Sequence, residues 1–241
     1  MREAPENTRA AFDRALSGPL DGIELDVQLT RDGVPVLHHD RTLARVGGGR
    51  KRIADHSYSM LRQKDWGGWF SEAFAGEKIL SLEEALQRYG TRTRLLIEIK
   101  SRTRDRVGGR SAELTKRVLD LLEDNIPEEK RSNIFVLSFD PEVLALARRQ
   151  SPGWRYVLNL SGPRPGLDAH TSQFLAARCL AVRKLDRAFV EETRGAGQLV
   201  MTYSCNVPAQ VRKAVGLGAD VVMSDRPGWL ARHLQRGGND S

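Results

Sequence analysis

The residues IELDVQLTRDGVPVLHHD (23–40) carry the strongest structural signal in this sequence. An apolar run holds two carboxylates, Glu24 and Asp26, and is followed by a Gly-containing turn. Side chains two residues apart on a strand point to the same side, so Glu24 and Asp26 share one face. Burying two carboxylates side by side is costly unless a cation or protons compensate their charge. The stretch therefore predicts a strand that ends at a charged functional site.

A second run, RLLIEIK (94–100), repeats this pattern with Glu98 and Lys100. If the two strands are parallel neighbours, three carboxylates and one lysine converge where the strands end. Carboxylate oxygens are the ligands of hard divalent cations, so we expect Mg²⁺ or Ca²⁺ rather than Zn²⁺. Lys100 remains as a cation for an anionic substrate group. A set of internal salt bridges is the structural alternative.

The rest of the chain alternates strands with helices. Strands are expected at 21–29, 34–39, 94–100, 133–139, 154–160, 179–183, 198–204 and 220–224. Helices are expected at 5–16, 81–90, 111–124, 141–150, near 167–177, 187–195, 207–216 and 227–235. Seven of these strands are principal, and strands that alternate with helices predict parallel βαβ units. Eight such units form a TIM (β/α)8 barrel. We therefore expect an α/β TIM barrel over 1–241 that lacks its first strand.

Residues 41–80 are irregular and rich in Gly, Trp and charge, which indicates an excursion from the main fold, called the insertion below. The aromatic residues Trp66, Trp69 and Phe70 have two interpretations. They pack the insertion onto the barrel, or they form an apolar lip.

Composition limits the class of protein. The formal net charge is +7, with 40% hydrophobic and 29% charged residues. The basic residues are spread along the chain, with no recognition helix and no interleaved aromatics, so a nucleic-acid partner is not expected. No apolar run is long enough to span a membrane, and we expect a cytoplasmic protein. Cys179 and Cys205 are expected to be reduced and buried on strands.

His39 adds a group that exchanges protons near neutral pH. It lies just beyond the carboxylate strand, whereas His38 points the other way if the segment is extended. Asp40 either orients a histidine ring or caps the next turn.

The chain resembles the glycerophosphodiester phosphodiesterase family. The matching segments are PENTRAAF, IELDVQLTRDGVPVLHHDRTLARV, KILSLEEAL, LLIEIK, VLSFDPEVL, VMTYSCN and GADVVMSDRPGWL, in the family's order and spacing. The resemblance implies a TIM barrel with a small insertion after its second strand.

The resemblance also implies roles for particular residues. Glu24, Asp26 and Glu98 match the divalent-metal ligands, His39 matches one of two acid–base histidines, and Lys100 matches the phosphate-binding lysine. Tyr203 stands where relatives often have tryptophan beside the glycerol-binding region. The implied reaction is hydrolysis of a glycerophosphodiester to glycerol 3-phosphate and an alcohol.

One family motif has no counterpart. Relatives carry His-Arg-Gly shortly before PENT, where this sequence reads MREA. A late start, an incomplete fragment or a loss of activity would each explain the difference, and we expect the chain as given to be poorly soluble or weakly stable, with little or no activity. A barrel that binds metal or phosphate without catalysis is thus the alternative function. The sequence does not identify the alcohol group or the oligomeric state. Lysophospholipids are possible substrates if the aromatic residues of 41–80 form the apolar lip, and water-soluble glycerophosphodiesters are the alternative.

Overall fold

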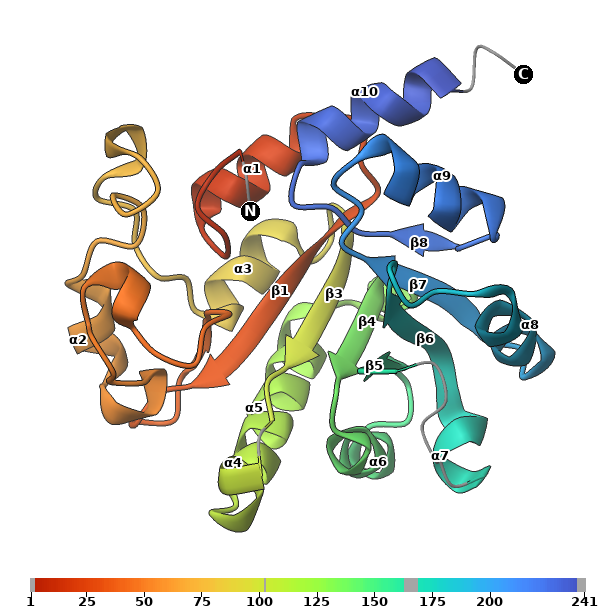
Figure 1. Cartoon of the computed structure of the whole chain (residues 1–241). Coiled ribbons are helices and arrows are strands. Elements are labelled where there is room, and N and C mark those ends of the chain that lie inside the picture. The colour runs from red at the N-terminus through yellow and green to blue at the C-terminus, as the bar shows by residue number, and fades with distance from the viewer. Residues whose placement is uncertain (1–2, 102, 163–168, 238–241) are drawn as a thin grey trace.

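The computed structural model describes residues 3–101, 103–162 and 169–237, and a curled sheet forms its centre (Figure 1). The sheet has eight strands in the order β2-β1-β3-β4-β5-β6-β7-β8, and only the β1–β2 pair is antiparallel. The strands are β1 (Gly22–Leu29), β2 (Pro35–Leu37), β3 (Arg94–Ile99), β4 (Ile134–Ser138), β5 (Arg155–Leu160), β6 (Leu175–Ala181), β7 (Leu199–Tyr203) and β8 (Val221–Val222). The seven parallel strands agree with the expected barrel topology.

Helices connect successive parallel strands and cover the outer face of the sheet (Figure 1). The α-helices are α1 (Arg9–Leu16), α2 (Tyr58–Arg62), α3 (Leu82–Tyr89), α4 (Thr103–Val107), α5 (Arg110–Asn125), α6 (Pro141–Gln150), α7 (Ala169–Phe174), α8 (Arg187–Gly195), α9 (Pro208–Gly216) and α10 (Pro227–Gly237). Short 3₁₀ turns are η1 (Ala44–Val46), η2 (Ile53–Asp55), η3 (Glu72–Phe74) and η4 (Glu128–Asn133). The helix α3 illustrates the local signals, since Ser81 caps its start in a capping box with Glu84.

Two expectations from the sequence were wrong. Residues 175–177, expected in a helix, begin β6, which pairs with β5 and β7 over its length. The alanine-rich sequence there favours a helix locally, but pairing between two buried neighbours outweighs that preference. Both cysteines are buried and free, yet Cys205 follows the end of β7 instead of lying in a strand.

The two faces of the sheet pack differently. The outer face packs against the helices in the largest apolar cluster, to which α5 contributes Leu114, Val118 and Leu122. The concave face holds a smaller apolar cluster around Phe135, Cys179 and Met201. Because this face is mostly apolar, the polar side chains that lie on it mark the candidate site.

The N-terminal loop lies between the two ends of the sheet. Among the described residues, β1 and β8 are not paired with each other. Asn7 binds the β1 side, where its Oδ1 accepts a hydrogen bond from the backbone N–H of Asp26 at 3.1 Å. Glu3 binds the other side, where its carboxylate accepts hydrogen bonds from the backbone N–H groups of Gly228 and Trp229 in the first turn of α10. The loop thus connects the open edge of β1 to the last helix.

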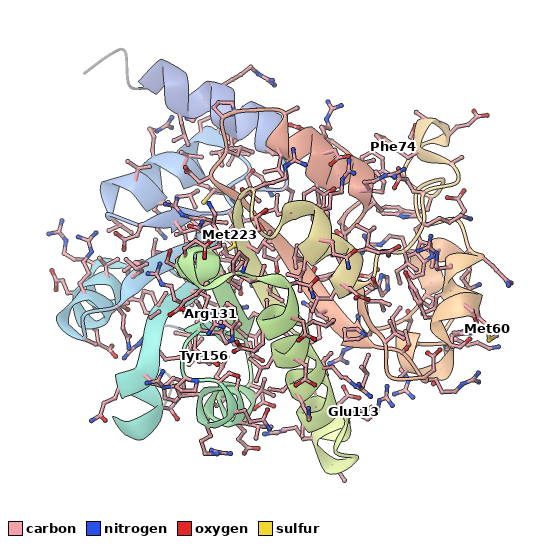
Figure 2. The ribbon with its side chains drawn as sticks, turned by 180° about the vertical axis from the view of Figure 1, so that it is seen from behind. Met60, Phe74, Glu113, Arg131, Tyr156 and Met223 are labelled. Atoms are coloured by element: carbon pink, nitrogen blue, oxygen red, sulfur yellow. The ribbon has the colours of Figure 1, made fainter. Side chains whose placement is uncertain are left out.

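The insertion, residues 41–80, has an apolar cluster of its own. Trp66 is 5% exposed in this cluster, and its indole N–H donates a hydrogen bond to the carbonyl of Leu61 at 2.9 Å. Trp69 is 38% exposed. In Figure 2 Met60 lies at the outer margin of the insertion, and Phe74 lies in its upper loop. Trp66 therefore packs the insertion and is not available for an apolar lip.

We expect Trp66→Ala to lower the free energy of unfolding by about 3–5 kcal/mol, because it removes a buried indole and leaves a cavity. Chemical denaturation followed by circular dichroism measures this loss. Trp69→Ala is the matched control and should cost about 1 kcal/mol or less, because the ring is more exposed and loses only its contacts with Arg45 and Phe70 and a hydrogen bond to the Trp66 carbonyl. Equal losses from the two variants would contradict the packing role of Trp66.

Candidate active site

Three carboxylates converge on the concave face of the sheet. Glu24 and Asp26 come from β1, and Glu98 comes from β3 directly opposite Asp26 in the parallel register. One carboxylate oxygen from each residue lies within 4.8 Å of the others. Asp26 and Glu98 are buried and Glu24 is partly exposed. The shared face expected from the spacing of these residues therefore exists, and its oxygens are close enough to coordinate one cation.

Lys100 compensates part of the negative charge. Its Nζ lies 2.7 Å from Asp26 Oδ1 and 2.8 Å from Glu98 Oε1. Glu24 forms no ion pair with Lys100 or with any other cationic group among the described residues. The four side chains thus form one buried group with a net excess of carboxylate.

This excess shifts the protonation equilibria. Burial raises the pKa of Glu24 well above its usual value, and the charges of Asp26 and Glu98 raise it further. Burial also raises the pKa of Glu98, although Lys100 opposes the shift. Burial alone would lower the pKa of Lys100, but the adjacent Asp26 and Glu98 raise it above its usual value. Without a bound cation, protonation of Glu24 and Glu98 is therefore easier than for a free glutamate, and the charge of Lys100 compensates part of the remaining negative charge.

Two asparagines that the sequence reasoning did not select also hold this group. Asn7 donates from Nδ2 to Asp26 Oδ2 at 2.8 Å, and its backbone has a positive φ of 57°. Asn159 on β5 donates from Nδ2 to Glu98 Oε2 at 3.0 Å, and its buried Oδ1 has no hydrogen-bond partner among the described residues. The PENT turn was the available signal for Asn7, while nothing in the spacing of the sequence marks Asn159.

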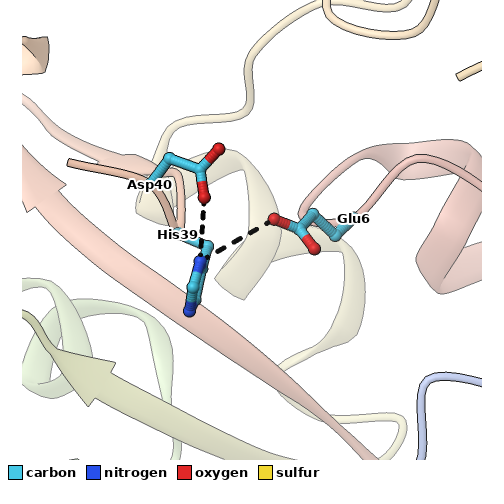
Figure 3. Close-up of side chains that lie close together, drawn as sticks. All are labelled: Glu6, His39 and Asp40. Atoms are coloured by element: carbon cyan, nitrogen blue, oxygen red, sulfur yellow. Dashed lines mark hydrogen bonds and ion pairs between the residues drawn. The ribbon is translucent and has the colours of Figure 1, made fainter. Parts of the chain in front are cut away.

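His39 lies in a second polar group at the edge of the site (Figure 3). Its Nδ1 is 3.1 Å from Asp40 Oδ1 and 4.0 Å from Glu6 Oε1. In Figure 3 the other ring nitrogen points away from both carboxylates. The contact with Asp40 places a proton on Nδ1 in the neutral ring, which leaves Nε2 as the acceptor. Of the two functions considered for Asp40, the geometry shows the contact with the ring.

Arg45 connects this second group to the insertion. Its guanidinium lies 2.7 Å from Glu6, 2.6 Å from Asp40 and 4.6 Å from the centre of the Trp69 ring. Burial disfavours ionisation of Asp40, but the hydrogen bond from His39 and the charge of Arg45 outweigh burial and lower its pKa. Arg45 already supplies the positive charge between Glu6 and Asp40. The group formed by Glu6, His39 and Asp40 is therefore a poorer cation site than the carboxylates on β1 and β3.

His38 has a different environment. It is 6% exposed, its Nε2 is 3.2 Å from the carbonyl oxygen of Thr42, and its ring meets the edge of Trp66 at 5.2 Å. Burial lowers its pKa. The extended backbone thus directs His38 into the insertion and His39 to the surface.

Tyr203 stands on the opposite side of the concave face, at the end of β7. Its ring packs edge-on against Phe139 at 6.5 Å, and Phe139 is 43% exposed. Burial raises the pKa of Tyr203 to about 12, so its hydroxyl is neutral at pH 7. Tyr203 and Phe139 thus form an aromatic surface at the carboxyl ends of β7 and β4.

A family model for the glycerophosphoryl diester phosphodiesterase family matches residues 1–229 of the chain. The chain belongs to this family. The match includes both strands of the carboxylate group and the segment that carries His39.

Individual relatives agree with the family assignment. A glycerophosphodiester phosphodiesterase of Bacillus subtilis is 27% identical over 238 residues, which cover 92% of this chain and 80% of that protein. One of Caldanaerobacter subterraneus is 46% identical over 101 residues, which cover 42% of each protein. The local match to the second relative therefore spans less than half of its length.

Solved structures of the family have the same fold. The phosphodiesterase of Oleispira antarctica, in complex with the product sn-glycerol-3-phosphate, superposes with a TM-score of 0.86 at 25% identity, covering 97% of this chain and 92% of that one. A glycerophosphodiester phosphodiesterase of Agrobacterium tumefaciens has a TM-score of 0.74 at 28% identity, covering 96% and 95%. The TIM-barrel fold expected from the sequence is confirmed. Within the described part of the chain, no helix is long and apolar enough to cross a membrane.

We expect Glu24→Gln to raise the free energy of unfolding of the metal-free protein. The variant replaces a carboxyl whose pKa is raised on folding, so the wild-type protein loses stability as pH rises above the ordinary pKa of glutamate. The advantage of the variant should therefore grow between pH 5 and pH 8. Thermal unfolding in the presence of a chelator measures it, and the exposed Glu113→Gln is the control. A variant no more stable than the wild type at pH 8 would contradict the charge excess.

Proposed function

We propose that this protein hydrolyses glycerophosphodiesters to glycerol 3-phosphate and an alcohol, with the help of Mg²⁺ or Ca²⁺. The observation that carries the proposal is the group of Glu24, Asp26 and Glu98, compensated by Lys100, in a chain of this family. In the reaction, a new P–O bond forms from water and the P–O bond to the alcohol breaks. The proton that leaves the water balances the proton gained by the alcohol oxygen.

The donor set fits a hard divalent cation. All three candidate ligands are carboxylates, and the buried Oδ1 of Asn159 is an additional oxygen acceptor beside Glu98 with no partner in the described structure. A bound cation would supply Lewis-acid polarisation of the phosphodiester and compensate its charge. Glu24, Asp26 and Glu98 would hold it, and Asn7 and Asn159 would orient two of these carboxylates.

The remaining residues have distinct roles in the proposal. Lys100 directs its ammonium group to a phosphate oxygen once the carboxylates bind a cation. His39 moves a proton through Nε2 while Asp40 fixes Nδ1. Tyr203, with Phe139, offers an aromatic wall to the glycerol part of the substrate.

A barrel that binds metal or phosphate without turnover is the second candidate. It is favoured by one observation: among the histidines whose side chains the structure describes, His39 alone is exposed, whereas the family resemblance implies two acid–base histidines. A release assay for glycerol 3-phosphate separates the two candidates. Turnover above the rate of the Asp26→Asn variant supports the enzyme, and metal binding without turnover supports the second candidate.

Chelation should abolish hydrolysis, and Mg²⁺ or Ca²⁺ should restore it, because the carboxylates then regain their cation. The same metal should raise the melting temperature, since a ligand at 100 times its dissociation constant stabilises the folded state by about 2.7 kcal/mol. Asp26→Asn and Glu98→Gln should weaken both effects, whereas Glu113→Gln should not. Full activity in excess chelator would reject the metal assignment.

His39→Ala should lower kcat by about 10²–10⁴-fold, the usual loss when a general acid or base is removed. His38→Ala should change kcat much less and act mainly on stability, because His38 packs in the insertion. Steady-state kinetics and thermal unfolding of both variants provide the test. Similar losses of kcat from the two variants would show that the exposed histidine has no special role.

A further inference from the structure

A pocket of about 410 Å³ lies beside the candidate active site. Its walls come from the end of β1, the first part of the insertion, α4 and the start of α5, and Lys100 forms part of its wall. Lys100 also contacts Asp26 and Glu98 of the carboxylate group. The pocket is therefore adjacent to the position proposed for the phosphodiester, on the β1–β3 side of the sheet, whereas Tyr203 is on the β7 side.

The walls of this pocket are basic. Four of the residues that line it are cationic, Arg41, Arg52, Lys100 and Arg110, and one, Asp105, is acidic. Lys100 has carboxylate partners, and Arg52 pairs with Asp55 at 3.1 Å. The charges of Arg41 and Arg110 have no carboxylate partner among the described residues. An anion that entered the pocket would therefore meet two positive charges that are not yet compensated.

Arg110 is already held in place. Its Nη2 donates hydrogen bonds to the carbonyl oxygens of Leu29 at 3.1 Å and Thr30 at 2.8 Å, both at the end of β1. These bonds fix the guanidinium without neutralising it. A guanidinium has five N–H donors in a planar fork, so Nε and Nη1 are left for a ligand. Less side-chain freedom is lost when an already positioned group binds an anion.

Arg41 is exposed and makes no hydrogen bond or ion pair within the described structure. It belongs to the same segment as His39 and Asp40, one residue beyond the latter. Because Arg41 and Lys100 line the same pocket, a substrate whose phosphodiester lies near Lys100 can place the part beyond the scissile bond near Arg41.

We propose that this pocket binds a second anionic group, a phosphate monoester or a carboxylate, carried by the alcohol part of the substrate. The inference rests on the proposed function, because it takes the phosphodiester to lie at Lys100. It assigns the substrate class as glycerophosphodiesters of anionic alcohols in preference to those of choline or ethanolamine. Arg41 and Arg110 are then residues that determine specificity.

The experiment compares substrates that differ in one anionic group. The pairs are glycerophosphoinositol with its 4-phosphate, and glycerophosphoethanolamine with glycerophosphoserine. We expect the anionic member of a pair to have the higher kcat/KM, and the preference to fall as salt screens the charges. A preference in the first pair alone assigns a phosphate group, and a preference in both pairs assigns either anion. Equal kcat/KM within both pairs would overturn the proposal even if all four substrates are hydrolysed.

Variants locate the preference in the pocket. Arg41→Gln should raise KM for the phosphorylated substrate about tenfold, the usual effect of losing one charge-assisted contact, and leave KM for its unphosphorylated partner unchanged. Arg50→Gln is the matched control, because Arg50 is an exposed arginine of the same insertion that does not line the pocket. Equal effects of the two variants would indicate general attraction by the net charge and overturn the proposal. Arg110→Gln, with its melting temperature measured, tests the second arginine.

A measurement of binding tests the pocket independently of the proposed reaction. Calorimetric titration of glycerophosphoinositol 4-phosphate into the wild-type chain and Arg41→Gln does not depend on turnover. Binding that Arg41→Gln weakens, in a chain that hydrolyses none of the substrates, would retain the pocket and reject the proposed reaction. Turnover of all substrates without any dependence on Arg41 would reject the pocket and retain the reaction.

Discussion

The excess negative charge that β1 and β3 place on the concave face is the constraint on which the rest of the site depends. Three carboxylates come close together on a face that is otherwise apolar, and Lys100 contacts two of them. Such a group is costly to bury without compensation. Hydrogen bonds from Asn7 and Asn159 reduce this cost in the metal-free protein, and the cost itself appears as raised pKa values of Glu24 and Glu98. The two asparagines also hold the carboxylates of Asp26 and Glu98 in place for a cation.

The position of this group follows from sheet geometry. Parallel pairing places Asp26 opposite Glu98, and the alternation of side chains brings Glu24 to the same face. The other side chains of the site lie on two sides of this carboxylate group. His39, Arg45 and the basic pocket lie on the side of the insertion, whereas Tyr203 and Phe139 lie at the ends of β7 and β4. A phosphodiester bound between these sides would meet cationic groups on one side and aromatic groups on the other.

Much of this arrangement could be predicted from the sequence because it depends on local periodicity. The two-residue spacing of Glu24 and Asp26 and the alternation of strands and helices predicted the shared face and the fold. The start of β6 could not be predicted, because its alanine-rich residues become a strand only through pairing with β5 and β7. Asn159 and Arg45 act through contacts with residues distant in sequence or in another element, and no periodic pattern marks them. The roles of His39, Lys100 and Tyr203 remain predictions.

The contacts of Asn7 have a consequence for cation affinity. This side chain holds both the backbone N–H of Asp26, at the open edge of β1, and the carboxylate of the same residue. Local opening of the N-terminal loop would release a main-chain bond and a candidate ligand in one event. Because Glu3 ties the same loop to α10, the free energy of that opening includes contacts far from the carboxylates. The apparent affinity for a cation would then vary with the fraction of molecules in which this loop is closed, so α10 takes part in setting it.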